Sequence, residues 1–261
     1  MTLLDKDGVR LTVDDSATVA TVTLANPVKR NAQSPALWRA LSEAGRLLPG
    51  SVRVAVLRGE GTSFSAGLDR QAFTPEGFDG EPSFIELAGG SDAVLDATIA
   101  EYQEAFTWWR RNDLITVAAV QGHAIGAGFQ LALACDLRVC ADDVQFSMRE
   151  TSLGLVPDLT GTHPLVGLIG YARALEICVT GRYVQAPEAE RTGLANLVVP
   201  ASELDAAVQD LTAALLAAPR DAVIETKALL RGATDRTYEE QRVAERAAQA
   251  RRLRDLAGIA E

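Results

Sequence analysis

A buried strand, a turn, a helix and a second buried strand follow one another twice along this chain. The first set spans residues 18–57 and the second spans residues 115–140. Runs of β-branched apolar residues indicate the strands, and a helix between two buried strands predicts a right-handed crossover. The order therefore predicts an α/β fold made of repeated units. The predicted strands and helices of the two sets are 18–24, 35–48 and 52–57, then 115–120, 129–135 and 137–140.

Three further stretches complete the predicted organisation. Residues 9–13 alternate apolar and polar side chains, which is typical of a half-buried strand. Residues 72–100 contain two prolines and four glycines, which predict a mobile loop or lid that is helical at most in part, with a helix resuming over 95–111. After Pro200 the chain is rich in Ala, Leu, Arg and Glu, which predicts a helical C-terminal region. Its helices are expected over 202–218, 221–232 and 237–257.

Charge and composition argue against several classes of protein. The formal net charge of −10 disfavours a nucleic-acid binder and a protein held at a membrane by basic residues, so neither partner is expected. Three cysteines in apolar surroundings predict reduced core residues, and two histidines without a Cys-x-x-Cys motif predict no metal site. Residues 1–15 lack the apolar core of a signal peptide, and polar residues interrupt the apolar stretch 114–134. A cytoplasmic location is therefore expected.

Two familiar enzyme motifs are present only in part. Gly122, Gly126 and Gly128 match a glycine pattern of short-chain nicotinamide dehydrogenases, but they lie mid-chain and no Tyr-x-x-x-Lys pair accompanies them. Ser65 lies outside a Gly-x-Ser-x-Gly motif, and neither histidine has a clear nucleophile partner in sequence. The residues therefore favour neither a dehydrogenase nor a serine hydrolase.

Two glycine-containing turns of similar context are the strongest chemical signal. Residues 64–69 and 122–128 each follow a strand and precede a short helix. Small residues let a ligand approach the backbone, and helix N-termini present unpaired N–H groups with partial positive charge. Two such turns can direct two N–H donors at one oxygen, which would form an oxyanion hole. The alternative is that both are tight turns required only by packing.

An ordered set of motifs resembles the enoyl-CoA hydratase/isomerase (crotonase) family. Each motif is modest, but together they follow the family's order from about residue 10 to residue 200. The matching stretches are 26–32, 59–69, 119–138, 146–158 and 175–195. The resemblance implies a crotonase-type spiral of repeated β-β-α turns, with an acyl-CoA-binding catalytic core over 1–200. It also implies a helical oligomerisation region over 201–261 and a homotrimer or a dimer of trimers.

The resemblance implies how an acyl-CoA or enoyl-CoA thioester would bind. The backbone N–H groups of Leu68 and Ala127 would hold the thioester carbonyl oxygen, and Ala66 would help to seat the adenine. Losing one such donor typically costs about 10²–10³ in rate. No separate cofactor is expected, because coenzyme A is part of the substrate. Further candidate substrate-binding residues are Gly67, Asp69, Gly126, Gly128 and Gln130 in or beside the two turns, and Lys29, Arg30 and Arg70 for the phosphates, although these three basic residues can equally serve solubility.

The sequence departs from the family at one acid–base position. Hydratases of the family use two glutamates; one aligns with Glu150, and Gln130 stands at the position of the other. Gln130 cannot accept a proton at neutral pH, although it can orient a water or pack as a polar core group. Glu150 is therefore the expected general base, with a surface salt bridge as its alternative role. Asp158 matches a functional aspartate of some relatives and is a second catalytic candidate, or else a helix N-cap or turn residue.

One carboxylate is enough to move a proton between two carbons. Adding water needs catalytic groups at both the water and the α-carbon. The sequence therefore favours double-bond isomerisation slightly over hydration. Hydration despite Gln130, hydrolysis or decarboxylation of a thioester, and a non-catalytic acyl-CoA-binding protein remain as alternatives. If only the second carboxylate is missing, Gln130→Glu should raise hydration.

Overall fold

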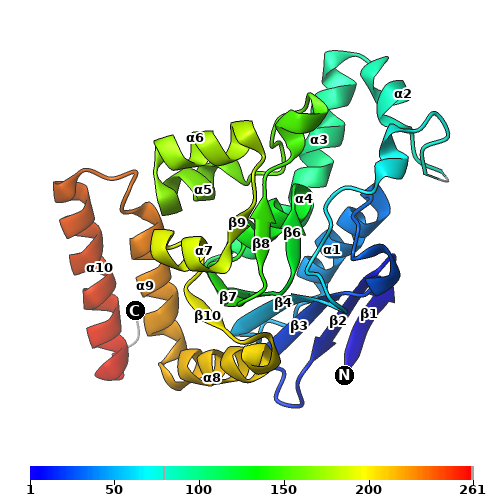
Figure 1. The fold of residues 1–261 in the computed structure, drawn as a ribbon. Helices are drawn as coiled ribbons and strands as arrows, with labels where there is room; N and C mark the ends of the chain where they lie inside the picture. The colour runs from blue at the N-terminus through cyan, green and yellow to red at the C-terminus, as the bar shows by residue number, and fades with distance from the viewer. Residues whose placement is uncertain (79, 260–261) are drawn as a thin grey trace.

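The computed structural model describes residues 1–78 and 80–259, and a seven-stranded sheet forms its centre (Figure 1). The strand order is β1-β2-β3-β4-β5-β7-β10. The first three strands are antiparallel, and every pair from β3 to β10 is parallel. The predicted strands correspond to β2, β3, β4, β5 and β7, whereas β1 and β10 were not anticipated. Their bounds are Thr2–Lys6, Val9–Val13, Val19–Leu24, Val54–Gly59, Ile115–Val120, Leu137–Ala141 and Leu197–Val199.

A smaller sheet, of order β6-β8-β9, lies beside the main sheet in Figure 1. It consists of His123–Ile125, Gln145–Ser147 and Val184–Gln185. The second glycine-containing segment is therefore not a simple turn, because β6 occupies its centre and pairs in parallel with β8. This pairing fixes the glycines on either side of β6 relative to the rest of the fold.

Helices cover the inner face of the main sheet. The helix α1 (Pro35–Leu47) begins at Ser34, whose side chain accepts a hydrogen bond from the Leu37 N–H. The helix α4 (Ala127–Ala134) is buried at all of its residues, which explains its continuous apolar sequence. The remaining helices of this part are α5 (Thr162–Ile169), α6 (Tyr171–Thr180) and α7 (Ala186–Thr192), with 3-10 helices at Pro27–Lys29, Arg70–Phe73, Trp108–Arg110, Glu150–Leu153 and Ala201–Glu203.

Residues 72–100 are more helical than predicted. Two helices lie there, α2 (Phe84–Ala88) and α3 (Asp92–Thr107), although α3 corresponds to the helix expected over 95–111. Ser83 and Glu86 form a capping box that starts α2 despite the flanking glycines. The first turns of α3 are solvent-exposed, so they carry no apolar stripe that the sequence could reveal.

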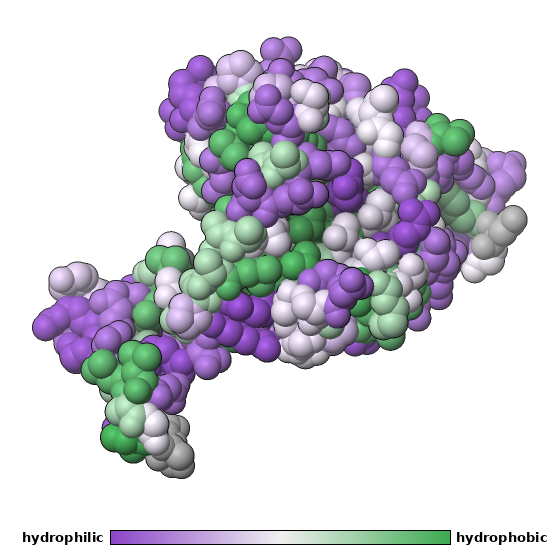
Figure 2. All heavy atoms as spheres, turned by 90° about the horizontal axis from the view of Figure 1, so that it is seen from below, coloured by the Kyte–Doolittle hydropathy of each residue, from purple (hydrophilic) through white to green (hydrophobic). Residues whose placement is uncertain are grey.

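The three predicted C-terminal helices are present as α8 (Leu204–Ala217), α9 (Arg220–Gly232) and α10 (Tyr238–Leu256). Leu204 and Val208 of α8 pack on the outer face of the main sheet, against alternate residues such as Val56 and Val117. The helices α9 and α10 project from the body as an arm (Figures 1 and 2). None of the helices in the described ranges combines the length and the apolar character needed to span a lipid bilayer.

Candidate active site

The two glycine-containing turns lie side by side. Ser65 and Ala124 form an isolated parallel bridge. The Ser65 N–H donates to the His123 carbonyl at 2.9 Å, and the Ile125 N–H donates to the Ser65 carbonyl at 3.0 Å. Segments about sixty residues apart in sequence are thus joined as neighbouring extended chains. The proximity that the oxyanion-hole interpretation needs is therefore present.

Glycine is required at the point where the two turns touch. Gly67 has a φ of +83°, and a Cβ there would lie 2.3 Å from the Ile125 carbonyl oxygen. Gly126 has a φ of +52° and precedes α4 without offering a capping side chain. A Cβ on Gly128 would lie 2.7 Å from the Ser65 Cβ. Gly67 and Gly128 therefore allow the close approach of the two turns, whereas a Cβ on Gly126 would lie 3.3 Å from Glu150 Oε1.

Two backbone N–H groups remain available between these turns. Within the described part of the chain, neither the Leu68 N–H nor the Ala127 N–H donates a hydrogen bond to another backbone group. Ala127 is the first residue of α4, where backbone N–H groups have no partner inside the helix. Both residues line the same cavity. The arrangement can place two donors on one bound oxygen.

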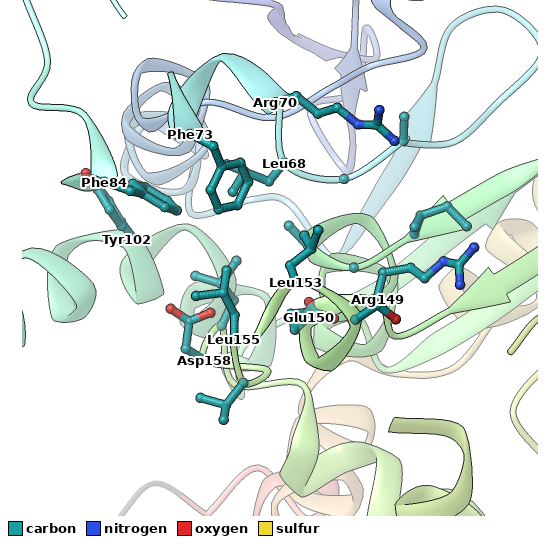
Figure 3. A pocket seen from close by; sticks show the side chains of 18 of the residues that line it. Leu68, Arg70, Phe73, Phe84, Tyr102, Arg149, Glu150, Leu153, Leu155 and Asp158 are labelled. Atoms are coloured by element: carbon teal, nitrogen blue, oxygen red, sulfur yellow. The ribbon is translucent and has the colours of Figure 1, made fainter. Parts of the chain in front are cut away.

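The cavity has a volume of about 1280 Å³ and a predominantly apolar wall. Figure 3 shows Phe73, Phe84 and Tyr102 gathered at one end, with Glu150 nearer the middle and Arg149 toward the other end. The sequence had placed no specific side chains at the apolar end and predicted only a loop or lid, helical at most in part, over 72–100. That segment contributes Phe73, Phe84, Leu87, Ala88, Leu95, Thr98 and Ile99.

Glu150 has its carboxyl group buried in the wall of this cavity. The residue is 9 % exposed and begins the 3-10 helix Glu150–Leu153. Its Oε1 accepts a hydrogen bond from Gln130 Nε2 at 2.6 Å, whereas its Oε2 has no hydrogen-bond partner. Burial raises the pKa of the Glu150 carboxyl above its usual range, and the negative charge of Asp158 adds to the rise. A carboxyl group in this state suits proton transfer better than it suits a salt bridge.

Asp158 lines the cavity near the same end as Leu155 and Tyr102 (Figure 3). Its backbone carbonyl accepts a hydrogen bond from Gln103 Nε2 at 2.6 Å. Burial raises the pKa of its carboxyl as well. The residue capping α5 is Gly161, so Asp158 is not the N-cap of that helix. The structure therefore brings both candidate carboxyl groups to one cavity.

Gln130 is fully buried on α4 and is not among the residues that line the cavity. Its amide nitrogen donates to Glu150, and its amide oxygen accepts from the Leu159 N–H at 2.9 Å and the Gly161 N–H at 3.2 Å. The side chain lies behind Glu150 rather than on the cavity wall, where the expected substrate-binding role would need it.

Comparison with known proteins identifies the family. The model of the family "Enoyl-CoA hydratase/isomerase" matches residues 14–255. The chain belongs to the enoyl-CoA hydratase/isomerase family. It is an enzyme of a family that acts on CoA thioesters, and the expected crotonase fold is confirmed. Its described residues contain no group of three or more His, Cys, Asp or Glu that could hold a metal ion.

Solved structures of hydratase/isomerase-family proteins match nearly the whole chain. A protein described as an enoyl-CoA hydratase from Thermobifida fusca YX, in complex with acetoacetyl-CoA, is 49 % identical with a TM-score of 0.91, covering 95 % of each chain. Among curated relatives, a protein of Mycobacterium bovis that is described as an enoyl-CoA hydratase is 32 % identical over 74 % of this chain and 69 % of its own length. A carnitinyl-CoA dehydratase of Salmonella enteritidis is 36 % identical over 72 % of this chain and 67 % of its own.

The basic residues that the sequence proposed for this hydratase/isomerase-family site separate into two groups. Arg30 and Arg70 line the cavity, as does Ala66. Lys29 instead forms an ion pair with Asp69 at 2.9 Å, and neither of these side chains lines it. Lys29 is therefore attached to the turn rather than directed at the cavity.

Sequence reasoning missed a cluster at the opposite wall. Arg149 lines the cavity, and its guanidinium lies 5.3 Å from the centre of the Tyr183 ring. Tyr183 is itself in edge contact with His123, and both line the cavity. The only signal in the sequence was the position of Arg149 directly before Glu150. Tyr183 gave none, because the small sheet that brings β9 to the site is a tertiary feature.

Proposed function

We propose that this family member is an enoyl-CoA isomerase that moves a double bond within an acyl-CoA thioester. The observation that carries the proposal is the environment of Glu150. One oxygen of its carboxyl is unpartnered in an apolar cavity, beside two free backbone N–H groups, and an amide stands where hydratases have their second carboxylate.

The backbone at the two turns would activate the substrate. The Leu68 and Ala127 N–H groups would donate to the thioester carbonyl oxygen. Removal of a proton next to that carbonyl places negative charge on the oxygen as an enolate forms. Fixed donors in a site of low polarity stabilise such a charge without reorganising, which lowers the barrier to proton removal.

Glu150 would carry the proton between two carbons. With a 3-enoyl-CoA, its carboxylate removes a proton from C2, and the electrons of that C–H bond form the enolate. The enolate collapses as C4 takes the proton back from the Glu150 carboxyl, which leaves the 2-enoyl-CoA. A raised pKa makes the Glu150 carboxylate a stronger base than a free glutamate, while its protonated form remains an acid, so one group can serve both half-reactions.

Hydration needs a second group to activate water, and Gln130 cannot supply it. Its nitrogen is engaged by Glu150 and its oxygen by two backbone N–H groups. Asp158 is the remaining carboxyl group in the cavity, and we assign it a secondary catalytic role near the acyl end. Relatives are described as a hydratase and a dehydratase, so hydration is the alternative function. The experiment must distinguish hydration from isomerisation.

Coenzyme A would enter at the end of the cavity that carries arginines. Arg30 and Arg70 would face its phosphates, while the backbone at Ala66 would contact the adenine. The Lys29–Asp69 ion pair would hold the turn that carries these groups. No other cofactor takes part in the proposed reaction.

The deciding experiment is mass spectrometry of 2-enoyl-CoA and 3-enoyl-CoA after incubation with the protein in D₂O. Double-bond migration with deuterium incorporation, and without a gain of D₂O, is the expected result. Addition of D₂O to the 2-enoyl substrate would establish hydration instead. Release of free thiol or CO₂ would indicate thioester hydrolysis or decarboxylation, and binding without any product would indicate a silent acyl-CoA binder.

We further propose that residues 201–261 mediate assembly into a trimer or a dimer of trimers. Large apolar side chains of the projecting arm are exposed, including Leu230 at 70 %, Tyr238 at 82 % and Leu256 at 85 %. Figure 2 shows hydrophobic atoms on the surface of this arm. Exposed apolar groups gathered on one arm favour contact with another surface. Light scattering coupled to size exclusion should give three or six times the 27.7 kDa of one chain. A monomer at micromolar concentration would contradict the proposal.

A further inference from the structure

Gln130 joins the general base to the turn that carries the second carboxyl group. Its Nε2 donates to Glu150 Oε1, and its Oε1 accepts from the N–H groups of Leu159 and Gly161. The residue is fully buried, and the atoms of its amide group all lie within the protein interior. The Gln130 amide group therefore forms all three of these hydrogen bonds in a single orientation.

The turn from Asp158 to Gly161 depends on that amide oxygen. Thr160 has a φ of +66°, which is an unfavourable backbone conformation for a β-branched residue. The two N–H groups that Gln130 accepts belong to the residues on either side of Thr160. Gly161 also packs closely against Gln130, so that an added Cβ there would lie 2.6 Å from the Gln130 Cγ. The amide oxygen thus holds a strained turn in place from inside.

We propose that Gln130 is a positioning residue, which fixes Glu150 through Oε1, leaves Oε2 as its proton-transferring atom, and locks the Asp158 turn against it. This inference deepens the function proposed above and rests on it for the role of Glu150. It differs from a substrate-binding role, because Gln130 does not line the cavity.

The amide of Gln130 satisfies every hydrogen bond at this position. The site needs a donor toward Glu150 and an acceptor toward two N–H groups, and glutamine provides both on one planar group. Gln130→Glu would place a carboxylate oxygen at the position that is now 2.6 Å from Glu150 Oε1. Two carboxylates at that distance share a proton rather than both ionise. The substitution should therefore impair the base instead of adding hydration.

The direction in which a Gln130 variant shifts the pKa of Glu150 follows from which form of the Glu150 carboxyl the amide stabilises. A donor to a carboxylate favours its ionised form, so removing the Gln130 donor raises the pKa of Glu150 further. The other titratable groups near Glu150 are Asp158 and Cys178, with Arg149 adjacent in the chain, and all three are unchanged in the variants. Loss of a hydrogen bond to a charged group corresponds to a rise of about 1–2 pH units.

The test is an NMR titration of the full-length protein labelled with ¹³C at the glutamate Cδ, without substrate. Glu150→Gln identifies the Glu150 resonance. Gln130→Met should raise the titration midpoint of Glu150 by about 1–2 units. Gln130→Glu keeps the shape of the side chain if the Met variant does not fold, and its last carboxyl proton should also leave at higher pH. Gln103→Leu is the matched control, because it removes a bond to the Asp158 carbonyl without touching Glu150.

A Glu150 midpoint that is the same in the wild type and in a folded Gln130 variant would overturn the proposal. So would a shift of equal size in the Gln103→Leu control. Since the titration needs no turnover, failure of the positioning role of Gln130 can be distinguished from failure of the proposed isomerase function. A shifted midpoint in a protein inert toward every enoyl-CoA would sustain the role of Gln130 and remove the isomerase function.

Discussion

Glu150 shows how burial changes the chemistry of an ordinary side chain. An aqueous glutamate is a weak base, but here one oxygen is held by Gln130 and the other has no partner in an apolar wall. The sequence predicted the residue and its role through a resemblance. It could not predict which oxygen is available, because that depends on a side chain twenty positions away on another helix.

Glu150→Gln should retain acyl-CoA affinity and lose about 10²–10⁴-fold in turnover, because the amide has nearly the same shape but cannot take a proton. Kinetics with the preferred enoyl-CoA, together with calorimetric binding of a saturated acyl-CoA, would measure both quantities. Unchanged kcat would remove Glu150 as the base.

The raised pKa of Glu150 also sets a direction for pH dependence. Since the base must be ionised, kcat should fall as pH drops through this raised pKa, at higher pH than for a free glutamate. Folding favours the protonated form, so stability should decrease as pH rises from about 4.5 through the raised pKa. Glu150→Gln should consequently be more stable than the wild type at pH 7 but not at pH 4. Chemical denaturation at both pH values checks the sign, and an equal stability difference at both would refute it.

Gly67→Ala should lower turnover by about 10²–10³-fold, since the new Cβ would push the Leu68 N–H away from its partner turn. Gly167→Ala on α5 is the matched control, because its Cβ would meet no atom within 4 Å and should leave turnover unchanged. Equal rates for both variants would argue against the Leu68 N–H as a donor.

At the scale of elements, the strands and helices that pack on the main sheet were readable from their apolar patterns. The helix α2 and the first turn of α3 were not, because these exposed segments are stabilised by a capping box and by distant ion pairs. Arg39 on α1, for example, bonds both Glu81 before α2 and Glu101 on α3. These partners lie more than forty residues from Arg39, so no local pattern marks the contact.

The helix α9 is anchored by Lys227, which is 6 % exposed. Its Nζ donates to the Leu114 carbonyl at 2.7 Å and to Asp136 Oδ2 at 2.6 Å. Lys227→Ala should lower the free energy of unfolding by about 2–4 kcal/mol, because it leaves the partly buried Asp136 without its cation. The exposed pair Lys6–Glu43 is the control, for which Lys6→Ala should cost about 0–1 kcal/mol. Denaturant unfolding measures both, and equal losses would contradict an anchoring role.

At the scale of the whole molecule, the two faces of the main sheet pack against different helices. Its inner face supports α1 and α4 and, through them, the cavity, while its outer face is covered by α8. The helix α8 therefore packs on the same sheet as residues before 200. The division at residue 200, the trimeric assembly and the cytoplasmic location stay predictions.

The sequence by itself determined the alternation of strands and helices, the two glycine turns, the family and the identity of the carboxyl groups. These features are local, since apolar spacing, glycine and charged residues are visible within a few positions. Only the tertiary structure decided that Gln130 lies behind Glu150, that Lys29 pairs with Asp69, and that α2, α3 and Tyr183 enclose the cavity. Each of these depends on contacts between segments distant in the chain, where packing and burial, rather than local propensity, select the partner.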